Sequence, residues 1–242
     1  MNKKKDWFSS WFNTPYYHLL YKDRDDTDAR VFMQNITAFL KLKPSTHILD
    51  LACGKGRHSV FLNSLGYKVT GADLSENNIL FANSFANNQL RFVKHDMRDP
   101  IINKYDAIFN LFTSFGYFVD EDEDIKVLKN IKNGLKEGGI AVVDFLNVYD
   151  AKKNLVRNEV KSIEGIDFFI NRKIENGFII KEIEFTIKGE HHSYFERVKY
   201  LDKEKFISYF KNAGLKVNHI FGDYNLSPFD KETSNRLIFV VS

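Results

Sequence analysis

The chain has 242 residues, and its 35 basic and 32 acidic side chains give a formal net charge of +3. Hydrophobic residues make up 43% and charged residues 28%, a globular composition that excludes a disordered chain. So small a net charge gives no reason to expect a nucleic-acid partner. A single cysteine, Cys53, excludes an internal disulfide, and no apolar run approaches the ~18 residues that span a bilayer. These features predict a cytoplasmic protein without membrane contact.

Residues 1–30 are expected to form an N-terminal arm that a charged run at 23–26 closes. Its aromatic side chains are Trp7, Trp11, Tyr16, Tyr17 and Tyr21. So much apolar surface does not stay free in water, so the arm is either part of the core or a lid over a ligand. Tyr17 and Tyr21 are four residues apart, and on a helix they would share one face and could both point into a cofactor cleft.

Residues 31–150 alternate between strand-like and helix-like apolar patterns. Strands are predicted at 48–51, 68–72, 90–94, 106–111 and 140–145. Helices are predicted at 29–40, 57–65, 75–86 and 122–136. The acidic run at 120–124 is expected to be a solvated helix start, where the helix dipole favours acids. The alternation predicts an α/β fold with a Rossmann-like, seven-stranded, mostly parallel sheet and helices on both of its faces.

Residues 151–201 interrupt this alternation and are expected to form an inserted antiparallel β meander. Three strands are predicted, at 166–175, 178–188 and 191–201. Asn176-Gly177 is a strong hairpin signal, and Gly189-Glu190 suits a second tight turn. Residues 202–242 are expected to complete the core with one helix and two strands.

The segment Leu49–His58 is expected to bind a ligand. A buried strand runs into a turn with Gly54 and Gly56 and then opens a helix, which is where doubly wound sheets bind ligands. The third glycine of a dinucleotide loop is absent, and Asp50 would repel a pyrophosphate but attract an α-amino or sulfonium group. Asp73 ends the next strand 23 residues later, near the offset of a ribose-binding carboxylate. S-adenosylmethionine, which has a ribose, cationic groups and no pyrophosphate, fits this pattern.

Asp50–Gly56 is similar to the D/E-x-G-x-G-x-G motif of class I S-adenosylmethionine-dependent methyltransferases, with Ala52 in place of the first glycine. Val69–Ser75 resembles the ribose-binding second strand, and His95–Arg98 resembles the turn that contacts adenine. Asp106–Phe112 resembles the strand beneath the methionine moiety. The resemblance implies S-adenosylmethionine as cofactor and S-adenosylhomocysteine as product. Together with the arm, it implies a cofactor-binding set of Tyr17, Tyr21, Asp50, Ala52, Gly54, Gly56, Asp73, Leu74, Asp96, Met97, Asn110 and Leu111.

Three further segments, Tyr16–Asp25, Asn110–Tyr117 and Gly222–Pro228, look like a bacterial small-molecule-type subgroup of this family. Asn110-Leu111-Phe112-Thr113 is not the Asn/Asp-Pro-Pro-aromatic pattern of nucleobase-amine and glutamine methyltransferases. A small-molecule acceptor, methylated by direct displacement at nitrogen or oxygen, is therefore favoured. Its pocket is expected between the arm, residues 112–118 and the inserted sheet. That sheet is alternatively a homodimer interface, as similar insertions are in relatives that modify amino sugars.

An acceptor hydroxyl would need a general base. The candidates are His58, Tyr117, Asp144 and Asp223. No metal site is expected, because adjacent His191 and His192 would point to opposite faces of a strand. Cys53 is expected to be a small buried side chain. Two alternative functions stay open: an NAD(P)-dependent oxidoreductase, and a non-catalytic protein that binds S-adenosylmethionine.

Overall fold

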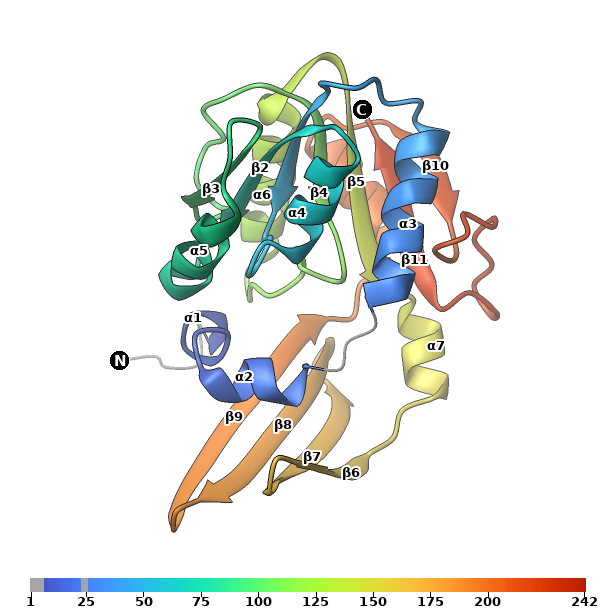
Figure 1. Cartoon of the computed structure of the whole chain (residues 1–242). Coiled ribbons are helices and arrows are strands. Elements are labelled where there is room, and N and C mark those ends of the chain that lie inside the picture. Colours follow the sequence, from blue (N-terminus) through green and yellow to red (C-terminus); the bar gives the residue numbers. More distant parts are fainter. Residues whose placement is uncertain (1–6, 23–25) are drawn as a thin grey trace.

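The computed structural model describes residues 7–22 and 26–242, which form two β-sheets (Figure 1). The strands of the larger sheet A are β1 (His47–Leu51), β2 (Lys68–Asp73), β3 (Leu90–Lys94), β4 (Tyr105–Asn110), β5 (Leu135–Leu146), β10 (Val217–Phe221) and β11 (Arg236–Val241). The helices around it are α3 (Asp26–Phe39), α4 (Arg57–Ser64), α5 (Glu76–Ala82), α6 (Glu121–Gly134) and α8 (Lys203–Asn212). The charged residues 23–25, predicted to close the arm, lie outside the described residues.

Sheet A has the strand order β10-β11-β5-β4-β1-β2-β3. Its neighbouring strands run parallel except for β11, which is antiparallel to both β5 and β10. The parallel strands β1, β2 and β4 therefore end at one edge of the sheet, where the loops that follow them meet. The predicted seven-stranded, mostly parallel sheet is confirmed.

Both faces of sheet A are buried, which explains the continuous apolar sequences of its strands. Successive strand residues point to opposite faces. Ile48 of β1 packs in the same cluster as Phe32 of α3, on one face. Leu49 packs in the same cluster as Leu128 of α6 and Phe206 of α8, on the other face. The helices on both sides hold the strand ends rigidly beneath the loops.

Sheet B is an antiparallel meander below sheet A (Figure 1). Its strands are β6 (Asn158–Ile163), β7 (Ile166–Glu175), β8 (Phe178–Ile187) and β9 (Glu190–Lys199). The three predicted strands are confirmed as β7, β8 and β9, but the prediction missed the fourth strand, β6. Its sequence is mostly polar and exposed, as an edge strand can be, so apolar alternation gave no signal. The short helix α7 (Val148–Lys153) leads into it from β5.

Helix α6 corrects the expectation that the whole acidic run at its start is solvated. Asp124 is fully buried and accepts a hydrogen bond from Lys199 of β9. Burial raises the pKa of Asp124 to about 6, and the Lys199 hydrogen bond and charge oppose the rise. Asp124 shares the inward helix face with Val127, Leu128 and Ile131, at helical spacing. The resulting ion pair joins sheet B to the core.

The arm contains two short helices, α1 (Trp7–Trp11) and α2 (Pro15–Leu20), which lie beside β8 and β9 (Figure 1). The ring of Trp11 lies 4.5 Å from that of Tyr194 on β9, and the ring of Tyr16 lies 4.7 Å from that of Phe185 on β8. The arm therefore packs against sheet B through these aromatic rings. None of the helices in the described part of the chain is long and apolar enough to cross a membrane.

Candidate cofactor and acceptor site

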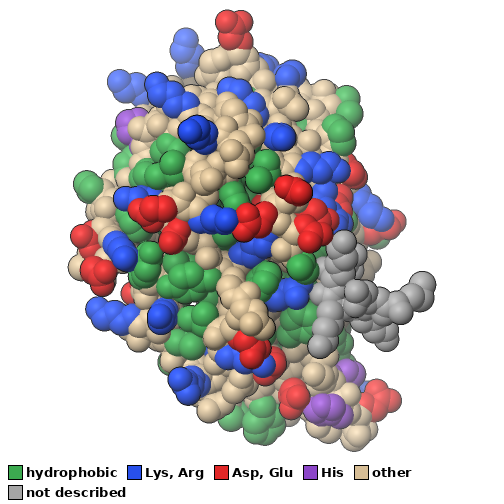
Figure 2. Space-filling model, turned by 180° about the vertical axis from the view of Figure 1, so that it is seen from behind, with side chains coloured by type: hydrophobic (Ala, Val, Ile, Leu, Met, Phe, Trp, Pro, Cys, Tyr) green, Lys and Arg blue, Asp and Glu red, His purple; other side chains and the backbone are tan. Residues whose placement is uncertain are grey.

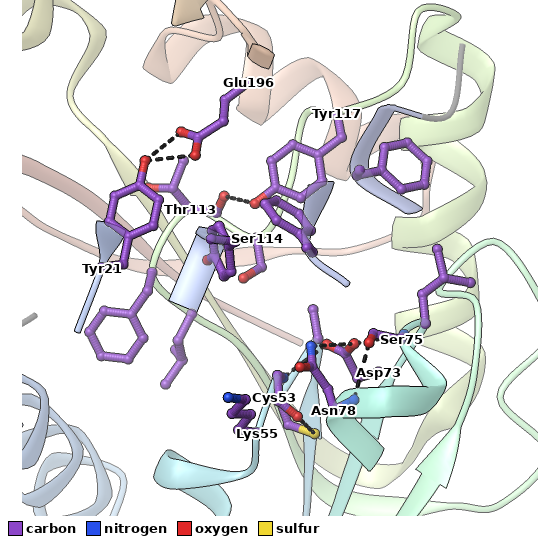
Figure 3. Close-up of a pocket in the computed structure, with 18 of the residues that line it drawn as sticks. Tyr21, Cys53, Lys55, Asp73, Ser75, Asn78, Thr113, Ser114, Tyr117 and Glu196 are labelled. Atoms are coloured by element: carbon purple, nitrogen blue, oxygen red, sulfur yellow. Dashed lines mark hydrogen bonds between the residues drawn. The ribbon is translucent and has the colours of Figure 1, made fainter. Parts of the chain in front are cut away.

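A cavity of about 590 Å³ lies where the carboxyl ends of β1, β2 and β4 face the arm and sheet B (Figure 3). Loops of sheet A contribute Asp50, Ala52, Gly54, Asp73, Leu74, Asp96, Met97 and Leu111. The arm and sheet B contribute Trp7, Phe12, Tyr17, Tyr21, Arg172, Ile179, Lys181 and Glu196. Among the described residues, the cavity wall thus includes all of the predicted cofactor-binding set except Gly56 and Asn110.

The turn between β1 and α4 has three residues at left-handed φ: Ala52 at +67°, Gly54 at +57° and Gly56 at +80°. A Cβ on Gly56 would stand 2.5 Å from the ring of Phe92, so packing as well as φ requires that glycine. A Cβ on Gly54 would meet no atom within 4 Å. Ala52 adopts the left-handed conformation that suits the motif's first glycine, and its N–H donates to the carbonyl of Ala72 at 2.7 Å. The departure from the motif leaves a tight turn in place.

Asp50 stands at the end of β1 and is only 2% exposed. Its Oδ2 accepts a hydrogen bond from Ser59 Oγ at 2.6 Å. Burial raises the pKa of Asp50 to about 6, while the Ser59 hydrogen bond opposes the rise and the charge of Asp73 adds to it. Above that pH, Asp50 places a buried negative charge at the cavity wall, which favours a cationic group of a ligand.

Asp73 joins the loop after β1 to the start of α5. Its Oδ2 accepts from the N–H of Gly54 at 2.8 Å, and its Oδ1 accepts from the N–H of Ser75 at 2.8 Å. Asn78 Nδ2 donates to the same Oδ1 at 3.4 Å. A carboxylate has about four lone-pair positions, so capacity remains for a ribose hydroxyl. Burial raises the pKa of Asp73, against the hydrogen bonds from Ser75, Gly54 and Asn78.

Asp96 lies at the cavity wall, where its carboxylate accepts hydrogen bonds from Arg98. Arg98 Nη2 donates to Asp96 Oδ2 at 2.6 Å, and the Arg98 N–H donates to Oδ1 at 2.9 Å. Arg98 also pairs with Glu123 of α6 at 3.1 Å. Asp96 of the predicted adenine turn thus lines the cavity, but an adenine amine would have to share the carboxylate with Arg98.

Asn110 supports the site from below rather than lining it. Its Nδ2 donates to the carbonyls of Leu51 at 3.1 Å and Ser114 at 3.3 Å, which links the loops after β1 and β4. The loop after β4 continues through Phe112 and Thr113, both at left-handed φ, +57° and +64°. Such strain in residues other than glycine persists only where surrounding contacts fix it, and it is often found at functional sites.

The contact that fixes this strained loop is Asp144, one of the predicted bases. Fully buried on β5, Asp144 accepts from the Phe112 N–H at 2.7 Å and from Arg236 Nε at 2.8 Å. Asp223 likewise accepts backbone N–H groups, from Asn225 and Ser227. Neither carboxylate is among the described residues that line the cavity. Their placement suits support of loops rather than contact with a substrate.

The other two base candidates do line the cavity. The ring of His58 stacks on that of Phe112 at a centroid distance of 4.2 Å, and its Nε2 lies 3.0 Å from Arg57 Nη2. The hydroxyl of Tyr117 donates to the carbonyl of Thr113 at 2.8 Å. His58 and Tyr117 therefore stay candidates for contact with the acceptor.

The wall opposite the cofactor loops contains a polar cluster of which sequence reasoning had singled out only Tyr21 and Trp11, as aromatic side chains of the arm. Glu196 of β9 accepts the hydroxyl of Tyr21 at 2.6 Å and 2.7 Å, and Oε1 also accepts Trp11 Nε1 at 2.9 Å. Lys181 of β8 donates to the same Tyr21 hydroxyl. Figure 3 shows Tyr21 and Glu196 across the pocket from Cys53 and Asp73. No local motif could have joined residues so distant in sequence.

Two observations concern metal-binding side chains and the thiol of Cys53. No three His, Cys, Asp or Glu side chains of the described residues are placed to hold a metal ion. Cys53 is buried and in no disulfide, and burial raises the pKa of its thiol. The thiol is therefore protonated at neutral pH, which is not the nucleophilic form.

The strand order of sheet A, the glycine turn after β1 and the carboxylates ending β1 and β2 agree with the class I S-adenosylmethionine-dependent methyltransferases that the sequence resembles. Residues 48–139 match the family model described as a methyltransferase domain. The match supports an S-adenosylmethionine-dependent methyltransferase rather than a dinucleotide oxidoreductase.

Two curated relatives illustrate the similarity. The chain is 30% identical over 145 residues to the probable S-adenosyl-L-methionine-dependent methyltransferase TehB of Haemophilus influenzae, covering 58% of this chain and 45% of the relative. It is 36% identical over 119 residues to the glycine/sarcosine N-methyltransferase of Halorhodospira halochloris, covering 46% of this chain and 43% of the relative. The chain therefore matches less than half the length of these two relatives.

A solved structure is similar over nearly the whole chain. It is an S-adenosylmethionine-dependent methyltransferase from Clostridium acetobutylicum, with a TM-score of 0.79 and 23% sequence identity. The match covers 94% of this chain and 95% of that one, so it includes sheet B as well as sheet A. At this identity the likeness establishes the fold.

The residues present fit S-adenosylmethionine as the cofactor. Asp73 retains hydrogen-bonding capacity for ribose, and the buried charge of Asp50 suits a cationic ligand group. The open space beside Gly54 gives a ligand close access to the backbone. Leu74 and Met97 offer apolar surface for the adenine ring.

Proposed function

We propose that this protein moves a methyl group from S-adenosylmethionine to a nitrogen or oxygen atom of a small-molecule acceptor. The observation that carries the proposal is the two-sided cavity: loops of sheet A form its cofactor side, and the arm and sheet B form the other. We call the second side the acceptor side. At about 590 Å³, the cavity has the size of small-molecule sites, which span roughly 300–1,000 Å³.

S-adenosylmethionine supplies a methyl group that its sulfonium has already activated for displacement. The work of the chain is therefore alignment and exclusion of water. Asp73 holds the ribose, and Asp50 provides the charge that favours a cationic group. Trp7 and Phe12 of the arm line the cavity, and an aromatic ring whose face meets a cation stabilises it by about 0.5–2 kcal/mol. His58 and Tyr117 are placed to take or share a proton if the acceptor is a hydroxyl.

Surface charge and similarity both favour a small acceptor over a nucleic acid. On the face shown in Figure 2, Lys and Arg side chains are interspersed with Asp and Glu rather than gathered into a basic stripe. The relative from Halorhodospira halochloris is a glycine/sarcosine N-methyltransferase, so its acceptors are small amines. These points support a small acceptor here, in a chain that we place in the cytoplasm.

The proposal divides the chain into four parts and includes a homodimer through sheet B. The parts are the arm (1–30), the cofactor-binding core (31–150), the insertion (151–201) and the C-terminal completion of the core (202–242). Val160 on β6 lies directly opposite Phe169 on β7, and both are more than half exposed, at 58% and 56%. An exposed apolar pair of this kind suits an interface between copies. Light scattering after size exclusion tests it, and a monomer at micromolar concentration refutes the dimer.

Calorimetry followed by a transfer assay tests the function. S-adenosylmethionine and S-adenosylhomocysteine should both bind to the purified protein, and NAD should not. Incubation with S-adenosylmethionine and a metabolite extract should then yield a product heavier by one CH₂ group, detected by mass spectrometry. Binding without any such product would favour the non-catalytic alternative.

A further inference from the structure

Three charged side chains form a row across sheet B. Arg172 on β7 lies directly opposite Lys181 on β8, and Lys181 lies directly opposite Glu196 on β9. Directly opposed residues of antiparallel strands point to the same face of a sheet, and all three residues line the acceptor side of the cavity. Their side chains are partly buried, with 22%, 14% and 18% exposed.

The two cations of this row are in an unfavourable arrangement for folding alone. Like charges at directly opposed positions destabilise a sheet. Nearby acids offset part of the repulsion: Arg172 pairs with Glu159 at 2.6 Å, and Lys181 Nζ lies 4.0 Å from Glu196 Oε2. Glu159 and Glu196 thus match the two cations in number. Both cations line the cavity, where an anionic group of a ligand would reach them.

The opposite face of the same strands provides an internal comparison. Lys173 follows Arg172 on β7, so its side chain points away from the cavity. There Lys173 pairs with Glu182 of β8 at 2.8 Å, the ordinary stabilising arrangement of opposite charges. The opposed cations thus occur on the cavity face, where a ligand can reach them.

Glu196 occupies a fixed position at the end of the row. Tyr21 and Trp11 of the arm both donate to it. An ionised carboxylate only accepts hydrogen bonds, so the group that completes its coordination must be an N–H or O–H donor. Among the described residues, the other carboxylates of the cavity wall are Asp50, Asp73 and Asp96, which belong to the cofactor side.

We propose that Arg172 and Lys181 bind an anionic group of the acceptor, and that Glu196 binds the N–H or O–H group beside it. This rests on the proposed function and narrows it to acceptors with an amine or hydroxyl together with a carboxylate or phosphate. Arginine has five N–H donors, of which Arg172 uses one on Nη1 for the carbonyl of Val156 and one on Nη2 for Glu159, and lysine adds a point charge. Arg172, Lys181 and Glu196 then determine specificity for the acceptor, and the sheet A loops bind the cofactor.

Fractionation of a metabolite extract tests the acceptor class. An anion exchanger under alkaline conditions retains compounds with a carboxylate or phosphate and releases the others. Each fraction is incubated with the protein and S-adenosylmethionine carrying a trideuterated methyl group. The labelled product should come from the retained fraction, and phosphatase treatment of that fraction abolishes it only if the anion is a phosphate. If labelled product forms only with the released fraction, the inference is wrong. If the whole extract yields no labelled product, the proposed function is refuted instead.

Two variants with a matched control test the residues. Arg172→Gln and Lys181→Gln should each raise the apparent KM, measured by dilution of the active fraction, by about tenfold, as expected for loss of one charge-assisted hydrogen bond. Lys173→Gln removes a cation from the same strand but from the opposite face, and should leave the KM unchanged. Calorimetry with S-adenosylhomocysteine should give the same Kd for all three variants. If the KM of both cavity-face variants stays within twofold of that of the parent, the row does not bind the acceptor. Lower thermal stability and weaker cofactor binding without a change in KM would mean that the row is structural.

Discussion

The two sides of the cavity are formed by contacts between residues at very different separations in the sequence. On the cofactor side, Ser59 donates to Asp50 and Gly54 donates to Asp73, over 9 and 19 residues of sequence. On the acceptor side, Trp11 donates to Glu196 over 185 residues. One side is a local turn that many sequences can share, whereas the other exists only once the arm has docked on sheet B. The first suits a common cofactor and the second an individual acceptor.

Removal of an arm anchor should have the largest effect on the acceptor side. Trp11 is 1% exposed, packs on Tyr194 and donates to Glu196. Trp11→Ala should lower the free energy of unfolding by about 3–5 kcal/mol, the usual cost of truncating a buried tryptophan. Urea denaturation measures the change. A loss below about 1 kcal/mol would mean that the arm is a loosely attached lid rather than core.

Limited proteolysis with and without S-adenosylhomocysteine separates the two roles of the arm directly. A lid is cut readily in the free protein and protected in the complex, because closure excludes protease as well as water. Equal resistance in both states indicates core packing. Trp7 and Trp11 are buried and Tyr17 is half-buried at the cavity wall, so we expect only the rate of cleavage near Tyr17 to depend on the ligand.

Substitution of two glycines in one turn should separate folding from binding on the cofactor side. Gly56→Val places a branched side chain against the ring of Phe92 at left-handed φ. It should cost about 1–3 kcal/mol of stability from overpacking and a further ~1–2 kcal/mol from strain. Gly54→Val meets no such ring and should instead fill space that the cofactor needs. Thermal melts and calorimetry on both variants check this, and equal destabilisation would contradict it.

Loss of the ribose carboxylate should have a smaller effect, seen mainly in cofactor binding. Asp73→Ala should weaken S-adenosylmethionine binding by about 1–3 kcal/mol, since ribose hydroxyls and the N–H groups of Gly54 and Ser75 lose a charged acceptor. Calorimetry measures the Kd, with the exposed Asp167 of sheet B as a control for Asp→Ala. A Kd equal to that of the parent would place the ribose elsewhere.

The same difference in sequence separation explains which parts of the cavity could be predicted from the sequence and which could not. The turn at Gly54 and Gly56 and the spacing of Asp50 and Asp73 lie within 24 residues, so short local motifs indicated most of the cofactor side. Glu196 had no such signal, because its partners come from the arm. Strand β6 was missed because exposed edge strands need no apolar alternation.

Two missed side chains show the limit of composition as a guide to burial. Asp124 stands in a run of five acids, and composition alone favours solvent for all of them. Its place on the apolar face of α6 and the distant Lys199 reverse that expectation. Long-range pairing of charges decides burial here, and it becomes visible only in three dimensions.

Acid should weaken cofactor binding by a modest and calculable amount. The pKa of Asp50 is raised by burial from 3.8 to about 6, so the carboxyl in the folded protein takes up its proton as the pH falls through about 6. A neutral Asp50 no longer attracts a cationic ligand. Between pH 7 and pH 5 its ionised fraction falls roughly tenfold, so the Kd for S-adenosylmethionine should rise by about tenfold, or ~1.4 kcal/mol.

Protonation of Asp50 has the opposite effect on folding stability: it stabilises the ligand-free fold. A folded-state pKa above the unfolded value means that ionised Asp50 destabilises the ligand-free fold at neutral pH, and this cost disappears as the pH falls through about 6 toward 4. Asp50→Asn tests both effects: its Kd should be weaker at pH 7 and vary less between pH 7 and pH 5. Calorimetry at the two pH values measures this, and a parent protein whose Kd does not change would show that Asp50 supports the turn through Ser59 without attracting the cofactor.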